Sequence, residues 1–278
     1  MMSIEIILCV FSVLMLILAS LFDLKTREVP DTLSYIFVFG VVGISLLYSL
    51  YTTISFFLWS LLGLTVFFLF GYMLYVTKQM GGGDVKLLAG LGAVFANNSL
   101  WNFPLLSYFF FALLFVGAGY TLTWGLVLYL KSFHDANKKA KDLLQAKKAF
   151  RFSLFFLALL VFIALFFIED PMTRIMLASL VLITIITFYL YIFIKVVESL
   201  HFLKKVSISE LTEGDWLAKD VHINNKLICS AKHPCLDKKQ IEKLKKAKVD
   251  HVLIKIGIPF VPAILLATIF TYILYFFF

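Results

Sequence analysis

Residues 54–77, ISFFLWSLLGLTVFFLFGYMLYVT, form the apolar run that decides the class of fold, because they contain no charged side chain. A helix of about 20 apolar residues spans the roughly 30 Å of hydrocarbon in a membrane. Similar runs fill much of the chain, which is 62% hydrophobic and has a mean hydropathy of +0.96, whereas soluble domains are about 45–50% apolar. The sequence therefore predicts an all-α polytopic membrane protein.

Eight apolar runs are predicted to be transmembrane helices. The fourth run is short and contains Gly90 and Gly92, so it can span only if the bilayer or the neighbouring helices accommodate it. The eight predicted spans are residues 3–22, 33–51, 54–77, 85–97, 104–130, 151–168, 172–196 and 258–278.

The distribution of positive charge predicts how these spans are oriented. If the N-terminus lies outside and all eight runs cross, the inside segments hold 24 of the 25 Lys and Arg residues, and only Arg174 lies outside. Positive charge marks cytoplasmic loops. Both termini are therefore expected outside the cell membrane. The net charge of +8 is attributed to these loops, and no nucleic-acid partner is expected.

The predicted organisation follows from the spans and the polar segments between them. The basic segment at 131–151 looks helical and is either an ordinary solvated linker or a surface that lies on anionic membrane lipids. The predicted parts are a membrane core at 1–130, this basic cytoplasmic linker at 131–151, membrane helices at 152–198, a cytoplasmic domain at 199–257 and a last transmembrane helix at 258–278.

The polar segment before the last span is predicted to be a small α/β domain. Asp237, with Gln240 three residues later, is typical of a helix start and begins a predicted Lys-rich helix that reaches about Lys248. The predicted strands are Val206 to Leu211, the two runs that flank Asn224-Asn225, and Val252 to Ile256.

The same polar segment contains a loose cluster of possible metal ligands, His222, Cys229, His233 and Cys235. Structural zinc sites show tighter, paired spacing, so neither a metal nor another cofactor is expected. Because the segment is placed in the cytosol, a disulfide between Cys229 and Cys235 is not expected either.

Two acids at predicted membrane edges stand out, because ionisable groups near spans are often functional. Asp23 closes the first span and Asp84 opens the fourth, which places both at the cytoplasmic face. Two carboxylates that share a partly dry site cannot both ionise easily and can activate water for attack on a peptide carbonyl. Taken singly, each acid also has a purely structural interpretation. Asp84 could be a helix cap and nothing more, and Asp23 could be an interfacial acid paired with Arg27.

These residues carry a resemblance to a known family. Residues 81–87, GGGDVKL, resemble the GxGD signature of polytopic aspartic proteases, and more closely the G-G-G-D-x-K-L stretch of type IV prepilin and archaeal preflagellin (archaellin) peptidases. Residues 23–31, DLKTREVPD, resemble the family's other aspartate segment, in which basic residues and an Ile/Val-Pro-Asn/Asp sequence follow the aspartate. The resemblance covers roughly residues 1–130.

The resemblance implies a membrane aspartic endopeptidase with Asp23 and Asp84 as its catalytic pair. Its substrates would be pilin-like or archaellin-like precursors, cut at the end of a short basic leader on the cytoplasmic side. The first inside loop lacks the two CxxC pairs common in bacterial members, which fits the archaeal branch. Residues expected to shape the site are Gly81, Gly82, Gly83, Lys86, Arg27 and Asp31.

Two other classes of function stay open from the residues alone. An ion- or proton-coupled transporter could use the two carboxylates, although the halves of the chain show no repeat and the spans carry no further polar groups near their centres. A non-catalytic membrane anchor for the cytoplasmic domain would require neither acid.

Overall fold

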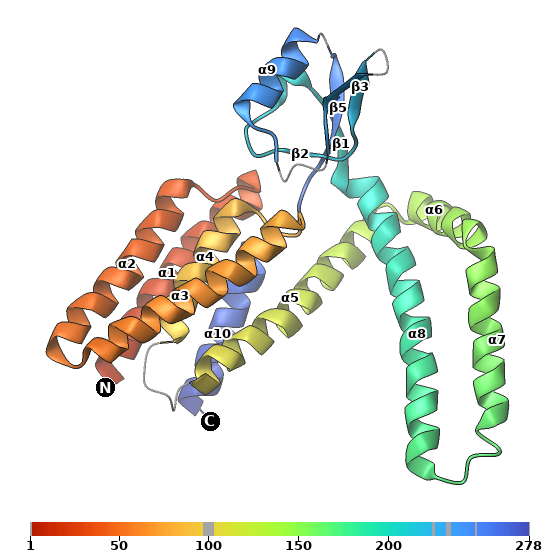
Figure 1. The fold of residues 1–278 in the computed structure, drawn as a ribbon, viewed down its shortest axis with the longest axis horizontal. Coiled ribbons are helices and arrows are strands. Elements are labelled where there is room, and N and C mark those ends of the chain that lie inside the picture. The colour runs from red at the N-terminus through yellow and green to blue at the C-terminus, as the bar shows by residue number, and fades with distance from the viewer. Residues whose placement is uncertain (1, 97–102, 224–225, 232–234, 248, 278) are drawn as a thin grey trace. The chain divides into compact units, whose positions relative to one another are not determined.

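Figure 1 shows the computed structural model of the chain, which describes residues 2–96, 103–223, 226–231, 235–247 and 249–277. The chain divides into two compact units. One consists of Met1–Trp124 and Lys205–Phe278, and the other of Gly125–Lys204. The predicted span ends at residues 97 and 278 lie outside the described residues.

Each of the eight apolar runs contains a helix, although the sixth run leaves its helix after Ala164 and the eighth enters its helix only at Val261. Five of the helices, α1, α2, α3, α5 and α8, are long and apolar enough to cross a membrane, whereas α4, α7 and α10 have 14, 17 and 17 residues. The helix bounds are α1 Met2–Thr26, α2 Asp31–Tyr51, α3 Ile54–Val76, α4 Gly82–Phe95, α5 Phe103–Lys131, α6 Phe133–Ala146, α7 Lys148–Ala164, α8 Pro171–Val197, α9 Lys238–Lys246 and α10 Val261–Phe277.

Helix α4 is the centre of the first unit. It packs against α1, α2 and α3, and every residue from Leu87 to Ala96 is buried. Its 14 residues extend only about 21 Å at 1.5 Å per residue. From Leu87 onward α4 is apolar on all sides, and such a helix is stable where other helices surround it. The neighbouring helices that a short span would need are therefore present around α4.

Two glycines allow α3 and α4 to cross at very short range. A methyl group added to Gly63 would lie 2.2 Å from the carbonyl oxygen of Gly92, and one added to Gly92 would lie 2.3 Å from the carbonyl oxygen of Gly63. Only residues without a side chain permit this approach of two backbones. The crossing fixes α4, and the residues at its N-terminus, against α3.

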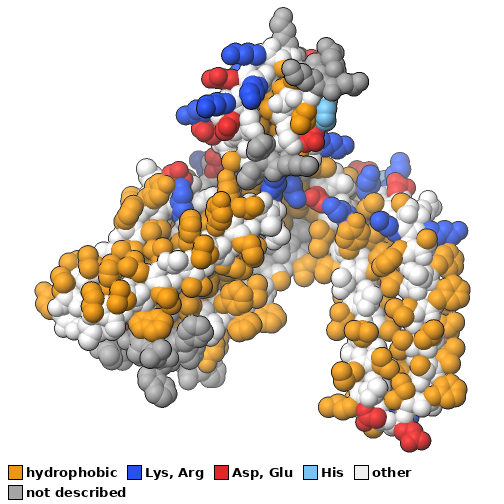
Figure 2. Space-filling model, in the orientation of Figure 1, with side chains coloured by type: hydrophobic (Ala, Val, Ile, Leu, Met, Phe, Trp, Pro, Cys, Tyr) orange, Lys and Arg blue, Asp and Glu red, His pale blue; other side chains and the backbone are white. Residues whose placement is uncertain are grey.

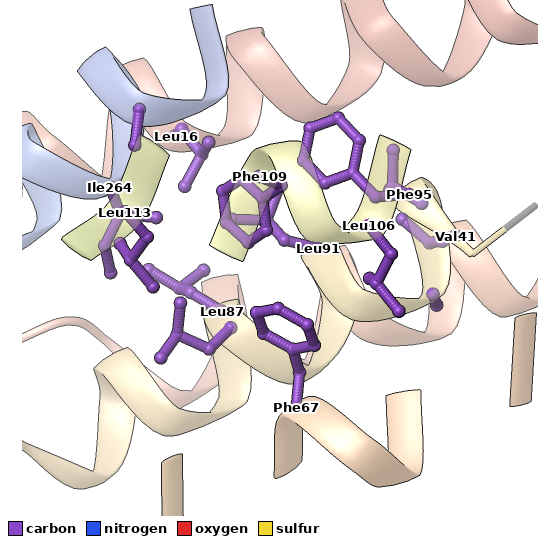
Figure 3. Packing of buried hydrophobic residues seen from close by; sticks show 14 of the residues in the cluster. Leu16, Val41, Phe67, Leu87, Leu91, Phe95, Leu106, Phe109, Leu113 and Ile264 are labelled. Carbon is purple, nitrogen blue, oxygen red and sulfur yellow. The ribbon is translucent and has the colours of Figure 1, made fainter. Parts of the chain in front are cut away.

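The apolar core of the first unit joins α1, α3, α4, α5 and α10. Figure 3 shows Leu16, Phe67, Phe95, Phe109 and Ile264 pointing toward one another from these five helices. The rings of Phe95 and Phe109 are stacked with centroids 4.5 Å apart, an arrangement typical of favourable aromatic pairs. This packing places the last helix of the chain beside the first.

The ends of α1 and α3 adopt the same local conformation. Arg27 follows α1 with φ of 59°, and Lys78 follows α3 with φ of 58°. Each residue has a left-handed backbone conformation and ends its helix. Glycine usually occupies such a position. The backbone N–H of Arg27 still donates to the carbonyl of Asp23 at 2.8 Å. These two turns direct the chain away from the helices directly after Asp23 and directly before Gly81.

The α/β segment, residues 203–255, contains a three-stranded sheet in the order β1-β5-β2 and a β3-β4 hairpin. The strands are β1 Leu203–Ser207, β2 Trp216–Leu217, β3 Val221–Ile223, β4 Lys226–Cys229 and β5 His251–Lys255. The α/β character, the hairpin, the α9 start capped by Asp237 and the last strand agree with the sequence. The first strand differs, because a 3-10 turn at Ile208–Glu210 replaces its predicted second half. Helix α9 ends at Lys246, and Lys248, where it was expected to end, lies outside the described residues.

The second unit is built from the end of α5 and from α6, α7 and α8. The predicted helix within 131–151 is present as α6, which buries Ala136 in a cluster with Leu154, Phe188 and Ile192 from α7 and α8. Hydrophobic side chains cover the visible faces of α7 and α8, as they cover α2 and α3 in the first unit (Figure 2). In the first unit, Lys and Arg side chains gather on the α/β segment (Figure 2).

Candidate active site

Asp23 lies near the C-terminal end of α1 and is only 5% exposed. Its Oδ2 accepts a hydrogen bond from the backbone N–H of Val261 at 2.9 Å, and the backbone of Phe260 faces the same carboxyl group. Both residues are at the start of α10, whose unsatisfied N–H groups favour a negative charge. The N-terminus of the last helix therefore holds the acid of the first.

The alternative interpretation of Asp23 was an ion pair with Arg27. The guanidinium instead donates from Nη1 to the carbonyl oxygen of Gly257 at 3.4 Å. Arg27 still acts electrostatically on Asp23, but from a greater distance than an ion pair would have. It thereby connects the turn after α1 to the segment that leads into α10.

Asp84 is the third residue of α4 and is half-buried. Its Oδ2 accepts a hydrogen bond from the backbone N–H of Gly81 at 3.3 Å, so it caps the start of the helix. The capping role considered from the sequence is therefore present. A single long hydrogen bond uses one of about four acceptor positions on a carboxylate, which leaves most of the group available.

The two acid-bearing segments are in direct contact. Val29, six residues after Asp23, packs on Gly83, which precedes Asp84, and a methyl group at Gly83 would lie 2.9 Å from the Cβ of Val29. The two carboxyl groups are close enough for the charge of Asp23 to act on Asp84. Residues 61 positions apart in the chain are thus brought together at one end of the helices.

The three glycines have different surroundings. Gly83 is enclosed by Val29, whereas Gly82 is exposed and the nearest atom to an added methyl group is a ring carbon of Tyr75 at 3.9 Å. At Gly81 the nearest atom is Oδ2 of Asp84 at 3.5 Å. Gly83 is therefore required for packing between the segments, whereas a methyl group at Gly81 or Gly82 would make only ordinary contacts.

Lys86 and Asp31 pair with each other rather than with either central acid. Lys86 Nζ donates to Asp31 Oδ1 at 2.6 Å and lies 4.4 Å from the centre of the Tyr35 ring. The Asp31 side chain is 70% exposed. This pair connects the first turn of α2 to the first turn of α4, beside the contact between Val29 and Gly83.

The α/β segment contacts the chain just before the glycines. The Tyr75 hydroxyl lies 3.1 Å from the Cys235 sulfur, and Lys78 Nζ donates to the carbonyl of Ala231. Burial, together with the charge of Lys255, lowers the pKa of Lys78. These contacts secure the end of α3 from which the chain passes to Asp84.

The predicted Cys and His cluster is only partly described, because His233 lies outside the described residues. Cys229 is buried and donates to the carbonyl of Gln240, whereas Cys235 faces Tyr75. In the part of the chain that the structure describes, no three His, Cys, Asp or Glu side chains surround a common point where a metal could bind.

Two features near Asp23 were not predicted from the sequence. One is the start of α10, for which Pro259 and Pro262 were the available signal, since proline is favoured at helix starts. The other is Tyr120 on α5, whose hydroxyl is buried and has no hydrogen-bond partner among the described residues. Nothing in the local pattern around Tyr120 distinguishes it from other aromatic residues in the spans.

Residues 10–122 match the type IV leader peptidase family. The chain is 39% identical over 85 residues to a preflagellin peptidase of Methanococcus maripaludis, and the aligned part covers 28% of this chain and 34% of the relative. It is 34% identical over 95 residues to a preflagellin peptidase of Methanocaldococcus jannaschii, which covers 32% of this chain and 37% of the relative.

The aligned regions place limits on the comparison. The chain spans about a third of the length of these curated relatives, and no solved structure matches it. The leader peptidase match includes both Asp23 and Asp84 but ends just after Tyr120, so the start of α10 lies beyond it.

Proposed function

We propose that this type IV leader peptidase homologue is a membrane aspartic endopeptidase that removes the leader from preflagellin-like or prepilin-like precursors. The observation that carries the proposal is the contact between the two acid-bearing segments, which brings Asp23 and Asp84 into electrostatic range. The names of the relatives, both preflagellin peptidases, favour this activity over a transporter.

The two carboxyl groups supply the chemistry that peptide hydrolysis needs. The ionised acid takes a proton from water, and the water oxygen forms a bond to the carbonyl carbon. The protonated acid polarises the carbonyl and then gives its proton to the leaving nitrogen as the C–N bond breaks. Two carboxyl groups that act on each other share one proton more easily than they both ionise.

The proposed substrate fits the edge of the membrane. A precursor with an apolar helix enters the bilayer by that helix, and the end of its leader then lies at the depth of Asp23 and Asp84. We propose that all eight apolar helices span the membrane, with the site at the cytoplasmic face and both termini outside, because this arrangement places 24 of 25 Lys and Arg residues inside.

A direct test mixes the purified protein, in detergent or lipid, with a synthetic peptide that has a basic leader followed by an apolar helix. Mass spectrometry of the products identifies the bond that is cut. The proposal predicts one main cleavage at the end of the leader. A peptide in which the apolar segment is replaced by a polar one of the same length serves as the control and should be cut far more slowly. Equal cleavage of both peptides would contradict positioning by the membrane.

A further inference from the structure

Tyr120 carries a buried hydroxyl on a ring that is only partly buried. Its hydroxyl oxygen is inaccessible to solvent and has no partner among the described residues. A buried hydroxyl without a hydrogen-bond partner destabilises the folded chain, so this one needs an explanation. Ser20 and Thr268 share this property, but their short side chains keep the hydroxyl close to their own helix.

The position of Tyr120 is fixed by contacts along α5. Gly117, one turn earlier and on the same face, lies against the ring of Phe260, which a methyl group at Gly117 would approach to 3.1 Å. Phe260 and Val261 are the residues whose backbone faces Asp23. Tyr120 therefore lies on the face of α5 turned toward the start of α10.

Two further observations agree with this position and describe how the ring is held. The charge of Asp23 acts on Tyr120, so the two groups are near each other although no hydrogen bond joins them. The Tyr120 ring stacks on Trp124 with centroids 5.9 Å apart, and this contact restricts the ring. A held, neutral donor near a carboxyl group has the properties of an oxyanion-stabilising group.

We propose that Tyr120 is a third catalytic residue, whose hydroxyl donates a hydrogen bond to the scissile carbonyl oxygen once the substrate lies between Asp23 and Asp84. This inference rests on the proposed peptidase function. The substrate oxygen supplies the partner that the hydroxyl lacks. As water adds to the carbonyl carbon, negative charge develops on that oxygen and the hydrogen bond strengthens, so the effect appears in kcat.

The test compares Tyr120→Phe with two controls in the leader-peptide assay. Tyr108→Phe removes the hydroxyl of another tyrosine of the same helix, one that is 52% exposed. Thr268→Val removes another buried hydroxyl without a partner, seven residues along α10 from Val261. Tyr120→Phe should lower kcat about 10- to 100-fold, since removal of one oxyanion donor costs up to about 10²–10³ elsewhere. Its KM should change little, and both controls should retain the parent kcat.

Thermal unfolding separates this role from a structural one. Because the Tyr120 hydroxyl has no partner, Tyr120→Phe should leave the melting temperature unchanged or slightly higher. An unchanged kcat, or a fall in kcat that merely accompanies a lower melting temperature, would overturn the inference while the peptidase function stands. Asp23→Asn and Asp84→Asn are run beside it. Full cleavage by either aspartate variant would instead overturn the proposed function, and the role of Tyr120 with it.

Discussion

Val29 rests on Gly83, so the chain that follows one acid of the site packs directly on the residue that precedes the other. A methyl group at Gly83 would lie 2.9 Å from the Cβ of Val29 and 3.3 Å from its carbonyl oxygen. Backbone and a β-branched carbon cannot move aside as the end of a flexible side chain can. This contact therefore helps to set the spacing between the segments that carry Asp23 and Asp84.

Gly83→Ala should disturb both stability and activity. Overpacking of this kind typically costs about 1–3 kcal/mol, and a small displacement of a catalytic group can reduce the rate about 100-fold. Thermal unfolding and cleavage of the leader peptide would measure the two effects. Gly82→Ala is the matched control, because its nearest neighbour would be 3.9 Å away, and it should behave as the parent does.

Val29→Gly should not relieve the whole effect of Gly83→Ala, because it removes the Cβ at 2.9 Å but leaves the carbonyl oxygen of residue 29 at 3.3 Å from the added methyl group. It should recover part of the lost stability, and a double-mutant cycle would measure the coupling. Strict additivity of the two substitutions would contradict the direct contact.

Val261→Pro should impair catalysis with little change in the helix. Proline is tolerated at the first position of a helix, and it lacks the N–H that donates to Asp23. Hydrogen bonds to charged groups contribute about 1.5–3 kcal/mol, so the cleavage rate should fall about tenfold or more.

Val261→Ala provides the comparison for this substitution. It keeps the N–H but removes part of a fully buried side chain, so it should lower the melting temperature and retain the rate at temperatures where it is folded. If the alanine and proline variants cleave equally well, the hydrogen bond from α10 has no part in catalysis.

The ion pair between Lys86 and Asp31 should contribute little. The Asp31 side chain is 70% exposed, and exposed pairs are worth about 0–1 kcal/mol. Lys86→Gln and Asp31→Asn should each keep the cleavage rate within about fivefold of the parent, which corresponds to roughly 1 kcal/mol. A much larger loss for Lys86→Gln than for Asp31→Asn would show that Lys86 acts on the acids rather than on its partner.

The helices of this protein could be predicted from the sequence because each one is specified locally. The apolar run at 54–77 and the capped start at Asp237 need no information from distant residues. The positive charge of the loops also favoured a fourth span where α4 lies, although a helix of 14 residues is too short to be predicted as a span from its length. The first strand was misplaced because apolar and polar residues alternate from Val206 to Ser209, which indicates a strand, whereas the chain turns at Ile208–Glu210.

The surroundings of the acids could be predicted only in part. The motif resemblance predicted that Asp23 and Asp84 act together, and their segments do meet at Val29 and Gly83. The hydrogen bond from Val261 joins residues 238 positions apart, and no local pattern specifies which helix end meets which acid. Tyr120 was missed for the same reason, since its role depends on how α5 packs against the start of α10.

The measurement that tests the central claim most directly is the rate of leader-peptide cleavage by Asp23→Asn and Asp84→Asn, with Asp31→Asn as the control. Each amide keeps the shape of the side chain but cannot exchange a proton with water or the leaving amine. The account predicts that both central variants lose cleavage by at least about a thousandfold, as losses of essential proton-transfer groups do elsewhere, while Asp31→Asn stays near the parent. Cleavage by either central variant at the parent rate, in folded protein, would contradict it.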